Sequence, residues 1–436
     1  MHEGKLDRYP RILGLSKSII FGLYLIGKAP PNAFGPTTTL NVVRFLKRYA
    51  EKYGLPQPAA PRARPETPPI YLPCGTTKTG LHKVYQDSAI SDDVQFVRLT
   101  TFSNIWKDTC PDIRIMSRRE DCCAKCEQMR DAVIKARSEE EKQVALSVFQ
   151  EHMNKAYSSR DYYNSCIINA KQGKSKHLIF YFAEQLTIPS TTRQVGPMYF
   201  KVGRRIQLFG ICDTSLPRQA NYLFDEHQTI GPDGKKSHGP NCVISMLHHY
   251  LNSCQEDIPK LVLHADNCCA QNKNKSVVAY LSWRMIQGLH KELEYVFMEA
   301  GHTRSLVDGC FGLIKMKYRR QDNYNTDHLI QAVEKSAAST NVAVTYPAWQ
   351  WYNWDVFLAK YYKPIPAITK VSSIKFFSDG KCRTDNGDTH DIMKSKPKGM
   401  PNRIEPAGLT QDRTNYLRDK VAPLMPPEYL ASICSS

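Results

Sequence analysis

The amino-acid sequence predicts an α/β fold, with a mixed five-stranded sheet and flanking helices, preceded by a helical region. Up to about residue 170, apolar residues recur with helical spacing. From residue 176 onward, short apolar runs typical of strands alternate with helical segments. The chain of 436 residues, 42% of them hydrophobic, is long enough for two or three domains with a sizeable core.

Composition divides the chain into six predicted parts. Seven prolines between residues 54 and 73 mark a linker, and cysteines cluster after residue 109. The parts are a basic helical segment (1–55), a proline-rich linker (56–73), a helix-turn-helix-like segment (74–109), a zinc-stapled helical hairpin (110–170), the α/β core (176–365) and a polar C-terminal tail (366–436).

Charge favours an anionic partner. The formal net charge is +17, from 59 Lys and Arg against 42 Asp and Glu. A surplus of this size points to nucleic acid, although an ordinary basic surface is the simpler interpretation. The stretch "LNVVRFLKRYAEKY" has one apolar helical face. Its opposite face presents candidate DNA contacts at Arg44, Lys47 and Arg48.

Residues 74–109 are expected to form two short helices. Threonines precede the apolar positions of both "TTKTGLHKVYQDS" and "RLTTFSNIWKD", as helix caps do. Short helices that begin with Lys, Arg, Thr and Ser suit a helix-turn-helix. A small helical bundle without a binding role fits the same pattern, so both interpretations stay open.

The cysteine cluster predicts a structural zinc site. No secretory signal opens the chain, and the apolar run at 19–26 is too short to cross a bilayer, so we expect no membrane partner and reduced thiols. Two cysteines three residues apart can bind one metal from one helical turn. The predicted zinc ligands are Cys110, Cys123, Cys126 and His152, with Cys122 in reserve; the alternative is a set of buried thiols.

The α/β core is predicted from the order of its elements. Three strands are expected in "KHLIFYFAEQLTIP", "GPMYFKVGRRIQLFGICDT" and "QANYLFDEHQ". A helix, the strand "PKLVLHADN", a second helix, the strand "ELEYVFMEAGHT" and a third helix follow. This order matches the ribonuclease H-like fold, whose first three strands are antiparallel and whose later strands run parallel through helical crossovers.

That fold prescribes where carboxylates for two Mg²⁺ or Mn²⁺ ions would lie: on the first strand, after the fourth, and on the last helix. Asp266 follows the fourth strand, and Asp308 lies in the first turn of the last helix, where a carboxylate is also expected simply to stabilise the helix start. The middle of the first strand carries Tyr181, and its nearest acid, Glu184, faces the other way in a regular strand. His302, after the fifth strand, is a candidate to position a phosphate or carry a proton.

Basic residues beside these carboxylates are candidate contacts to a DNA backbone. Two lysines follow Asp266 directly, and two cations share the face of Asp308 on the last helix. We also expect Asn272 to cap the helix that begins near residue 273. The candidate backbone contacts are Lys273, Lys275, Lys315 and Arg319.

Two long stretches resemble a family of transposase-derived animal proteins. "LHADNCCAQNKNK" is similar to the family signature H-A-D-N-C-x-G-Q-N-K-N, and "EAGHTRSLVDGCFGLIKMKYRR" to its block G-H-T-x-x-x-x-D-x-x-F-G. Further similarity lies in "VVRFLKRYAEKYGLPQP", "TFSNIWKDTCPDIRIM" and the D-x-C-x-x-C cluster. The resemblance implies a DNA-binding amino-terminal region, a zinc-bearing helical hairpin and a ribonuclease H-like DDE/D transposase core.

One departure from the family decides the expected function. The family's first-strand motif F-D-[YF]-A-[QE]-Q stands here as "FYFAEQ", with Tyr181 in place of the aspartate. We therefore expect a nuclear DNA-binding protein with a degenerate, inactive core, able to form homo-oligomers. The alternatives are an active Mg²⁺-dependent nuclease or strand transferase that uses Asp266, Asp308 and Glu184, and a zinc-containing scaffold for protein partners.

Overall fold

The computed structural model describes residues 36–56, 70–73, 75–115, 122–216, 218–231, 238–254 and 260–434. The chain forms two compact units, residues 1–154 and 155–436, and the division falls within the long helix α7 (Glu139–Lys171). The basic segment before residue 36 and most of the proline-rich linker lie outside the described residues. No helix in the described ranges is long and apolar enough to span a membrane.

The amino-terminal unit contains a helical core. Its apolar side chains, Leu46, Phe102 and Trp106 among them, are buried together. Thr77 accepts a hydrogen bond from the Gly80 amide at 2.9 Å and so caps the helix that begins at Lys78, as its position in the sequence predicts. The elements are α3 (Pro36–Tyr53), α4 (Lys78–Ser91) and α5 (Leu99–Thr109), with a small sheet of β1 (Leu55–Pro56), β2 (Ile70–Leu72) and β3 (Ile113–Ile115).

One further helix and the first part of another follow in the same unit. Helix α6 (Ala124–Lys135) begins directly after Cys123, and α7 begins at Glu139. The first turn of α7 carries Glu139, Glu140 and Glu141, whose negative charges interact favourably with the positive end of the helix dipole.

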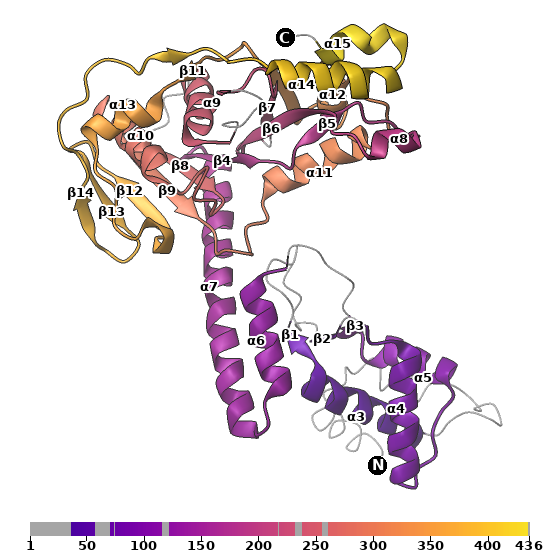
Figure 1. Ribbon diagram of the computed structural model, residues 1–436. Coiled ribbons are helices and arrows are strands. Elements are labelled where there is room, and N and C mark those ends of the chain that lie inside the picture. The colour runs from indigo at the N-terminus through magenta and orange to yellow at the C-terminus, as the bar shows by residue number, and fades with distance from the viewer. Residues whose placement is uncertain are drawn as a thin grey trace. The chain divides into compact units, whose positions relative to one another are not determined.

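The second unit is mixed α/β, built on one large mixed sheet with flanking helices, as the sequence predicts (Figure 1). The sheet has ten strands, however, and not five. Nine lie side by side in the order β10-β7-β6-β4-β8-β9-β12-β13-β14, and β5 pairs with β6. Their bounds are β4 (Lys176–Phe182), β5 (Leu186–Ile188), β6 (Arg204–Asp213), β7 (Arg218–Asp225), β8 (Lys260–Ala265), β9 (Glu292–Phe297), β10 (Asn341–Thr345), β12 (Ser373–Phe376), β13 (Lys381–Thr384) and β14 (Thr389–Asp391).

Strand directions in the middle of this sheet divide it into two halves. Strand β4 is antiparallel to β6, and β6 is antiparallel to β7. On its other edge, β4 is parallel to β8, and β8 is parallel to β9. The carboxyl ends of β4, β8 and β9 therefore lie at the same edge of the sheet.

Apolar cores cover both faces of the central strands. Leu178, Phe180 and Leu263 pack into one core, and Ile179 and Tyr181 into the other. Because both faces are covered, β4 and β8 carry apolar residues on both faces and show no alternation of apolar and polar positions. The first core is covered by α9 (Pro240–Ser253), α10 (Lys275–Ile286) and α13 (Trp354–Tyr361), and the second by the end of α7, α11 (Leu306–Tyr318) and α12 (Thr326–Glu334).

The sequence predicts a polar tail over residues 366–436, but the described part of this segment is folded. Strands β12, β13 and β14 extend the sheet beyond β9, and β15 (Arg403–Ile404) pairs with β11 (Trp351–Tyr352). Leu417, Val421 and Ile433 are buried in the second core. These apolar residues are spaced among many charged ones, so the average composition of the segment hides them.

Candidate functional site

Asp266 lies at the end of β8 and closes the turn that leads into α10. Its Oδ1 atom accepts hydrogen bonds from the Cys268 amide at 3.0 Å and from Asn272 Nδ2 at 2.7 Å. Both bonds are made within the loop, and the residue is half-buried. The carboxylate therefore has a local structural role in this loop.

The predicted cap of α10 was placed two residues too early. Asn274, and not Asn272, is the N-cap, and its Oδ1 accepts from the amides of Ser276 and Val277, both at 3.1 Å. Asn272 is fully buried and donates to Asp266 instead. In "QNKNK" both asparagines have cap chemistry, and only the backbone conformation distinguishes them.

Replacing Asn274 with alanine is expected to lower the free energy of unfolding by about 1 kcal/mol, because two amides of the first turn lose their acceptor. Asn274→Asp keeps an acceptor and should cost much less. Chemical denaturation of both variants measures the difference. Equal losses in the two variants would show that the cap bond is not what matters here.

Lys273 does not present its charge to solvent, which corrects its expected role as a DNA contact. Its side chain is buried, donates to Asn267 Oδ1 at 2.8 Å and lies over the Phe297 ring at 4.7 Å from the centroid. Burial lowers the pKa of the Lys273 ammonium. Lys275, two residues further on at the start of α10, is exposed and keeps the predicted role open.

Asp308 is hydrogen-bonded to Tyr181, the residue that replaces the expected first-strand carboxylate. The Tyr181 hydroxyl donates to Asp308 Oδ2 at 2.5 Å and lies 2.8 Å from Ser305 Oγ. Ser305 and Asp308 also form a capping box at the start of α11, in which the Ser305 amide donates to Asp308 Oδ2 at 2.7 Å. The Ser-x-x-Asp spacing was the available sequence signal for Ser305.

Electrostatics keep Tyr181 as the donor in this contact. Burial, and then the negative charge of Asp308, raise the pKa of the Tyr181 hydroxyl far above its usual value, so it stays protonated. The Arg160 guanidinium adds a positive charge near Asp308, although burial lowers the pKa of Arg160. The Asp308 carboxylate thus accepts a hydrogen bond from Tyr181 and lies near the positive charge of Arg160.

A glycine on β6, Gly210, lets α11 lie close to the sheet here. A Cβ atom on Gly210 would lie 2.7 Å from Phe311 Cζ of α11. The Phe311 ring in turn packs edge-on against Tyr181, with 6.0 Å between ring centroids. Gly210 therefore helps to bring Asp308, on the same helix, to Tyr181.

Glu184, Arg319 and His302 are further predicted site residues in this unit. Glu184 is 75% exposed and forms an ion pair with Lys315 at 2.7 Å, which lowers the pKa of the Glu184 carboxyl. Arg319 is exposed at the end of α11. His302 is buried in the loop after β9, where its amide donates to the Glu299 carbonyl at 2.9 Å and its carbonyl accepts from Arg160 at 3.0 Å.

A two-metal centre fits these residues poorly. In the described part of the chain, neither Asp266 nor Asp308 nor Glu184 belongs to a group of three metal-binding side chains whose ligand atoms lie within 4.8 Å of one another. Two-metal phosphoryl transfer needs carboxylates gathered around ions about 4 Å apart. The described side chains therefore give no support to the expected Mg²⁺ or Mn²⁺ site.

Three of the four predicted zinc ligands do come together in the amino-terminal unit. Ligand atoms of Cys123, Cys126 and His152 lie within 4.8 Å of one another, and Cys123 Sγ is 3.4 Å from His152 Nε2. All three residues are buried, and burial raises the pKa of the Cys126 thiol to about 12. This Cys/His group can hold a metal ion, whose positive charge would favour the thiolates.

Cys110 does not belong to this group, contrary to the sequence-based prediction. It is buried in the apolar core formed by α3, α4 and α5, with its sulfur 3.7 Å from Thr109 Oγ1. The prediction went wrong because Cys110 ends α5 and so belongs to the preceding helical core.

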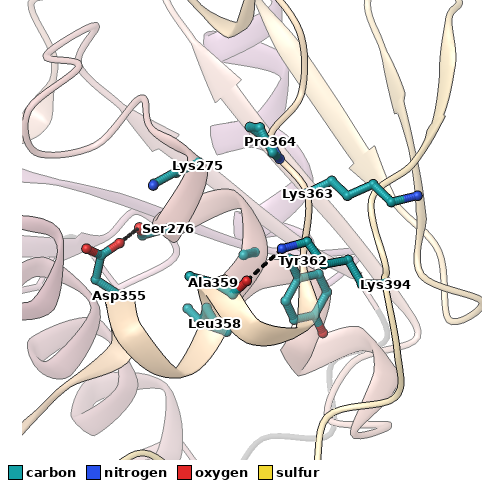
Figure 2. Close-up of a pocket in the computed structure, with 10 residues that line it drawn as sticks. Lys275, Ser276, Asp355, Leu358, Ala359, Tyr362, Lys363, Pro364 and Lys394 are labelled. Atoms are coloured by element: carbon teal, nitrogen blue, oxygen red, sulfur yellow. Dashed lines mark hydrogen bonds between the residues drawn. The ribbon is translucent and has the colours of Figure 1, made fainter.

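A small cavity of about 140 Å³ lies beside the first turn of α10, between α10 and α13 (Figure 2). Its polar groups bond to one another: Ser276 donates to Asp355 at 2.5 Å, and Lys394 donates to the Ala359 carbonyl at 2.8 Å. Small-molecule sites usually begin at about 300 Å³. The cavity is thus too small for a nucleotide.

Comparison with known proteins gives one match. A family model described as "Domain of unknown function (DUF7869)" matches residues 232–390, a stretch that includes β8, α10, β9 and α11. No curated protein and no solved structure matches the chain.

Proposed function

We propose that this chain is a transposon-derived, DNA-binding protein whose ribonuclease H-like core no longer cleaves or joins DNA. The observation that carries the inactive core is the hydrogen bond between Tyr181 and Asp308. A DNA-binding role would place the protein in the nucleus and is compatible with homo-oligomers.

The topology of the sheet supports a core of this kind. The adjacent strands β7, β6, β4, β8 and β9 combine an antiparallel half with a parallel half. Tyr181 lies on the first of them in sequence, Asp266 follows the fourth, and Asp308 lies on the helix after the fifth. These are the positions from which a ribonuclease H-like enzyme would draw its metal carboxylates.

Contacts at these positions argue against catalysis. The Asp308 carboxylate accepts from Tyr181 and from the Ser305 amide, and Asp266 accepts two bonds within its own loop. A hydroxyl with a strongly raised pKa cannot replace an anionic ligand, because it stays neutral. Both carboxylates therefore act as hydrogen-bond acceptors that stabilise their local structure.

Net charge and exposed cations support DNA as the partner. The chain carries a formal charge of +17. Arg44 and Arg48 are exposed on one side of α3, whose other side packs into the helical core through Val42, Val43 and Leu46. A cationic face on a helix whose apolar face is already buried is suited to phosphate contacts.

We further propose that the metal held by Cys123, Cys126 and His152 is zinc, in a structural role. Thiolate and imidazole donors together are typical of zinc sites. The ion would stabilise the start of α6 against α7, since Cys123 and Cys126 flank that start and His152 lies on α7.

Salt-dependent binding tests the DNA-binding role. The full chain should bind duplex DNA with an affinity that falls steeply as salt rises, because phosphate contacts release counterions. Exchanging Arg44 and Arg48 for glutamine should make the negative slope of log K against log salt shallower by about 2. It should also weaken binding to all DNA sequences alike.

The matched control is Lys135→Gln, which removes an exposed charge paired with Asp131 on α6. That variant should bind DNA like the wild type. Salt-independent or absent DNA binding by the wild type would instead favour the protein-scaffold alternative.

A further inference from the structure

A second group of buried metal-binding side chains lies between α7 and the sheet of the α/β unit. Cys166 comes from α7, His177 from β4 and His264 from β8. In the pairing of β4 with β8, His177 lies opposite Val262, and His264 follows Val262 by two residues on β8. Because strand side chains alternate, both imidazoles lie on one face, the face where Cys166 packs against Val262 and Val296.

The geometry of this group is that of a ligand set. One ligand atom from each residue lies within 4.8 Å of the others, and all three residues are buried. His177 Nε2 is 2.8 Å from His264 Nδ1. Two nitrogens bound to one tetrahedral zinc ion are about 3.3 Å apart, given zinc–nitrogen bonds of about 2.0 Å. A shift of about half an ångström would therefore suffice for an ion to bind both rings.

One nitrogen of the group has no partner. His264 Nε2 is buried and makes no hydrogen bond within the described residues. The far nitrogen of His177, by contrast, is 3.0 Å from Thr214 Oγ1, the kind of outer contact that orients a metal-binding histidine.

The surroundings favour neutral imidazoles and can accommodate a cation. Burial lowers the pKa of His177 to about 4 and lowers that of His264 as well, so both rings are in the form that binds metals. Glu294, buried on the neighbouring strand β9, contributes a negative charge near Cys166 and Tyr162. Lys260 lies 3.8 Å from the Glu294 carboxylate, so the Cys166 thiolate would supply most of the negative charge that faces a divalent ion.

We propose that Cys166, His177 and His264 bind a zinc ion that fixes α7 to the sheet. A mixed thiolate and imidazole set selects zinc over Mg²⁺ or Ca²⁺, which prefer oxygen ligands. The site is closed by the core around it, so its role is structural. It is independent of DNA binding and of the group at Cys123.

Cobalt substitution of the full chain tests this site. In a Cys123→Ser/Cys126→Ser background, which removes the other thiolates, Co²⁺ should still give a sulfur-to-cobalt charge-transfer band and one bound ion per chain. Adding Cys166→Ala should abolish both. The matched control, Cys382→Ala, removes another buried thiol of the same unit and should leave both unchanged.

A ligand-swapping variant covers the possibility that Cys166→Ala fails to fold. Cys166→Asp keeps an anionic ligand, so it should retain the ion and lose only the charge-transfer band. A folded background protein that binds no metal, or a band that persists in either Cys166 variant, would overturn the proposal. DNA binding is measured in a separate experiment. Failure of the metal-binding test therefore leaves the DNA-binding proposal standing, and the reverse also holds.

Discussion

Replacing Tyr181 with aspartate is expected to destabilise the protein and to create a site for Mg²⁺. The ring is 8% exposed, and its loss should cost about 3–5 kcal/mol of unfolding free energy, as for other buried aromatic residues. The new carboxylate faces Asp308, and the repulsion between two acids favours a divalent ion. At ten times its Kd, Mg²⁺ should return about 1.4 kcal/mol to Tyr181→Asp and nothing to the wild type, measured by thermal unfolding.

Two variants separate the causes. Tyr181→Phe removes only the hydroxyl that donates to Asp308, and it should cost about 1–3 kcal/mol without any response to Mg²⁺. Tyr181→Asp combined with Asp308→Asn should lose the Mg²⁺ response while remaining folded. If Mg²⁺ stabilises Tyr181→Asp no more than the wild type, Tyr181 does not occupy the position of a metal ligand.

Removing a zinc ligand is expected to give the second large effect. Cys126→Ser should lose the bound ion and unfold the region around the start of α6, because structural zinc sites in small domains contribute a large part of roughly 10–16 kcal/mol of binding energy to folding. Metal content by mass spectrometry and cleavage by trypsin in residues 122–154 measure the two consequences.

Neighbouring cysteines provide the controls for this experiment. Cys122→Ser changes an exposed residue next to the site, and Cys110→Ala changes one buried in the core of α3, α4 and α5. Both should retain zinc, although Cys110→Ala should lower stability through its packing. Loss of zinc from Cys110→Ala would show that Cys110 is a zinc ligand, as the sequence predicts.

The order of elements in the α/β unit was predictable because its central strands carry strong signals. Strands β4 and β8 are buried on both faces and carry mostly apolar residues without alternation, and α10 and α11 show clear helical spacing. The outer strands β12, β13 and β14 have no such signal. They are short, and their exposed residues are polar, so their place in the sheet follows from tertiary pairing.

The sequence predicts where the candidate site lies in the fold. It does not predict the contacts that the side chains of the site make. Asp266 and Asp308 lie where the sequence order puts them, and Tyr181 lies on the strand that lacks the third acid. That Tyr181 donates to Asp308 depends on the side-chain orientations of two elements far apart in sequence. Burial of Lys273 against Phe297 is of the same kind, because the sequence shows a lysine beside an acid and does not show the ring across the loop.

Metal-dependent cleavage of bound DNA is the most direct test of the inactive core. Wild type and Asp266→Asn would be compared on duplex DNA with Mg²⁺ or Mn²⁺, at protein and salt concentrations where both proteins bind. An inactive core should give no cleavage or strand-transfer product in either protein, with equal DNA affinity. A metal-dependent product from the wild type that Asp266→Asn fails to make would contradict it.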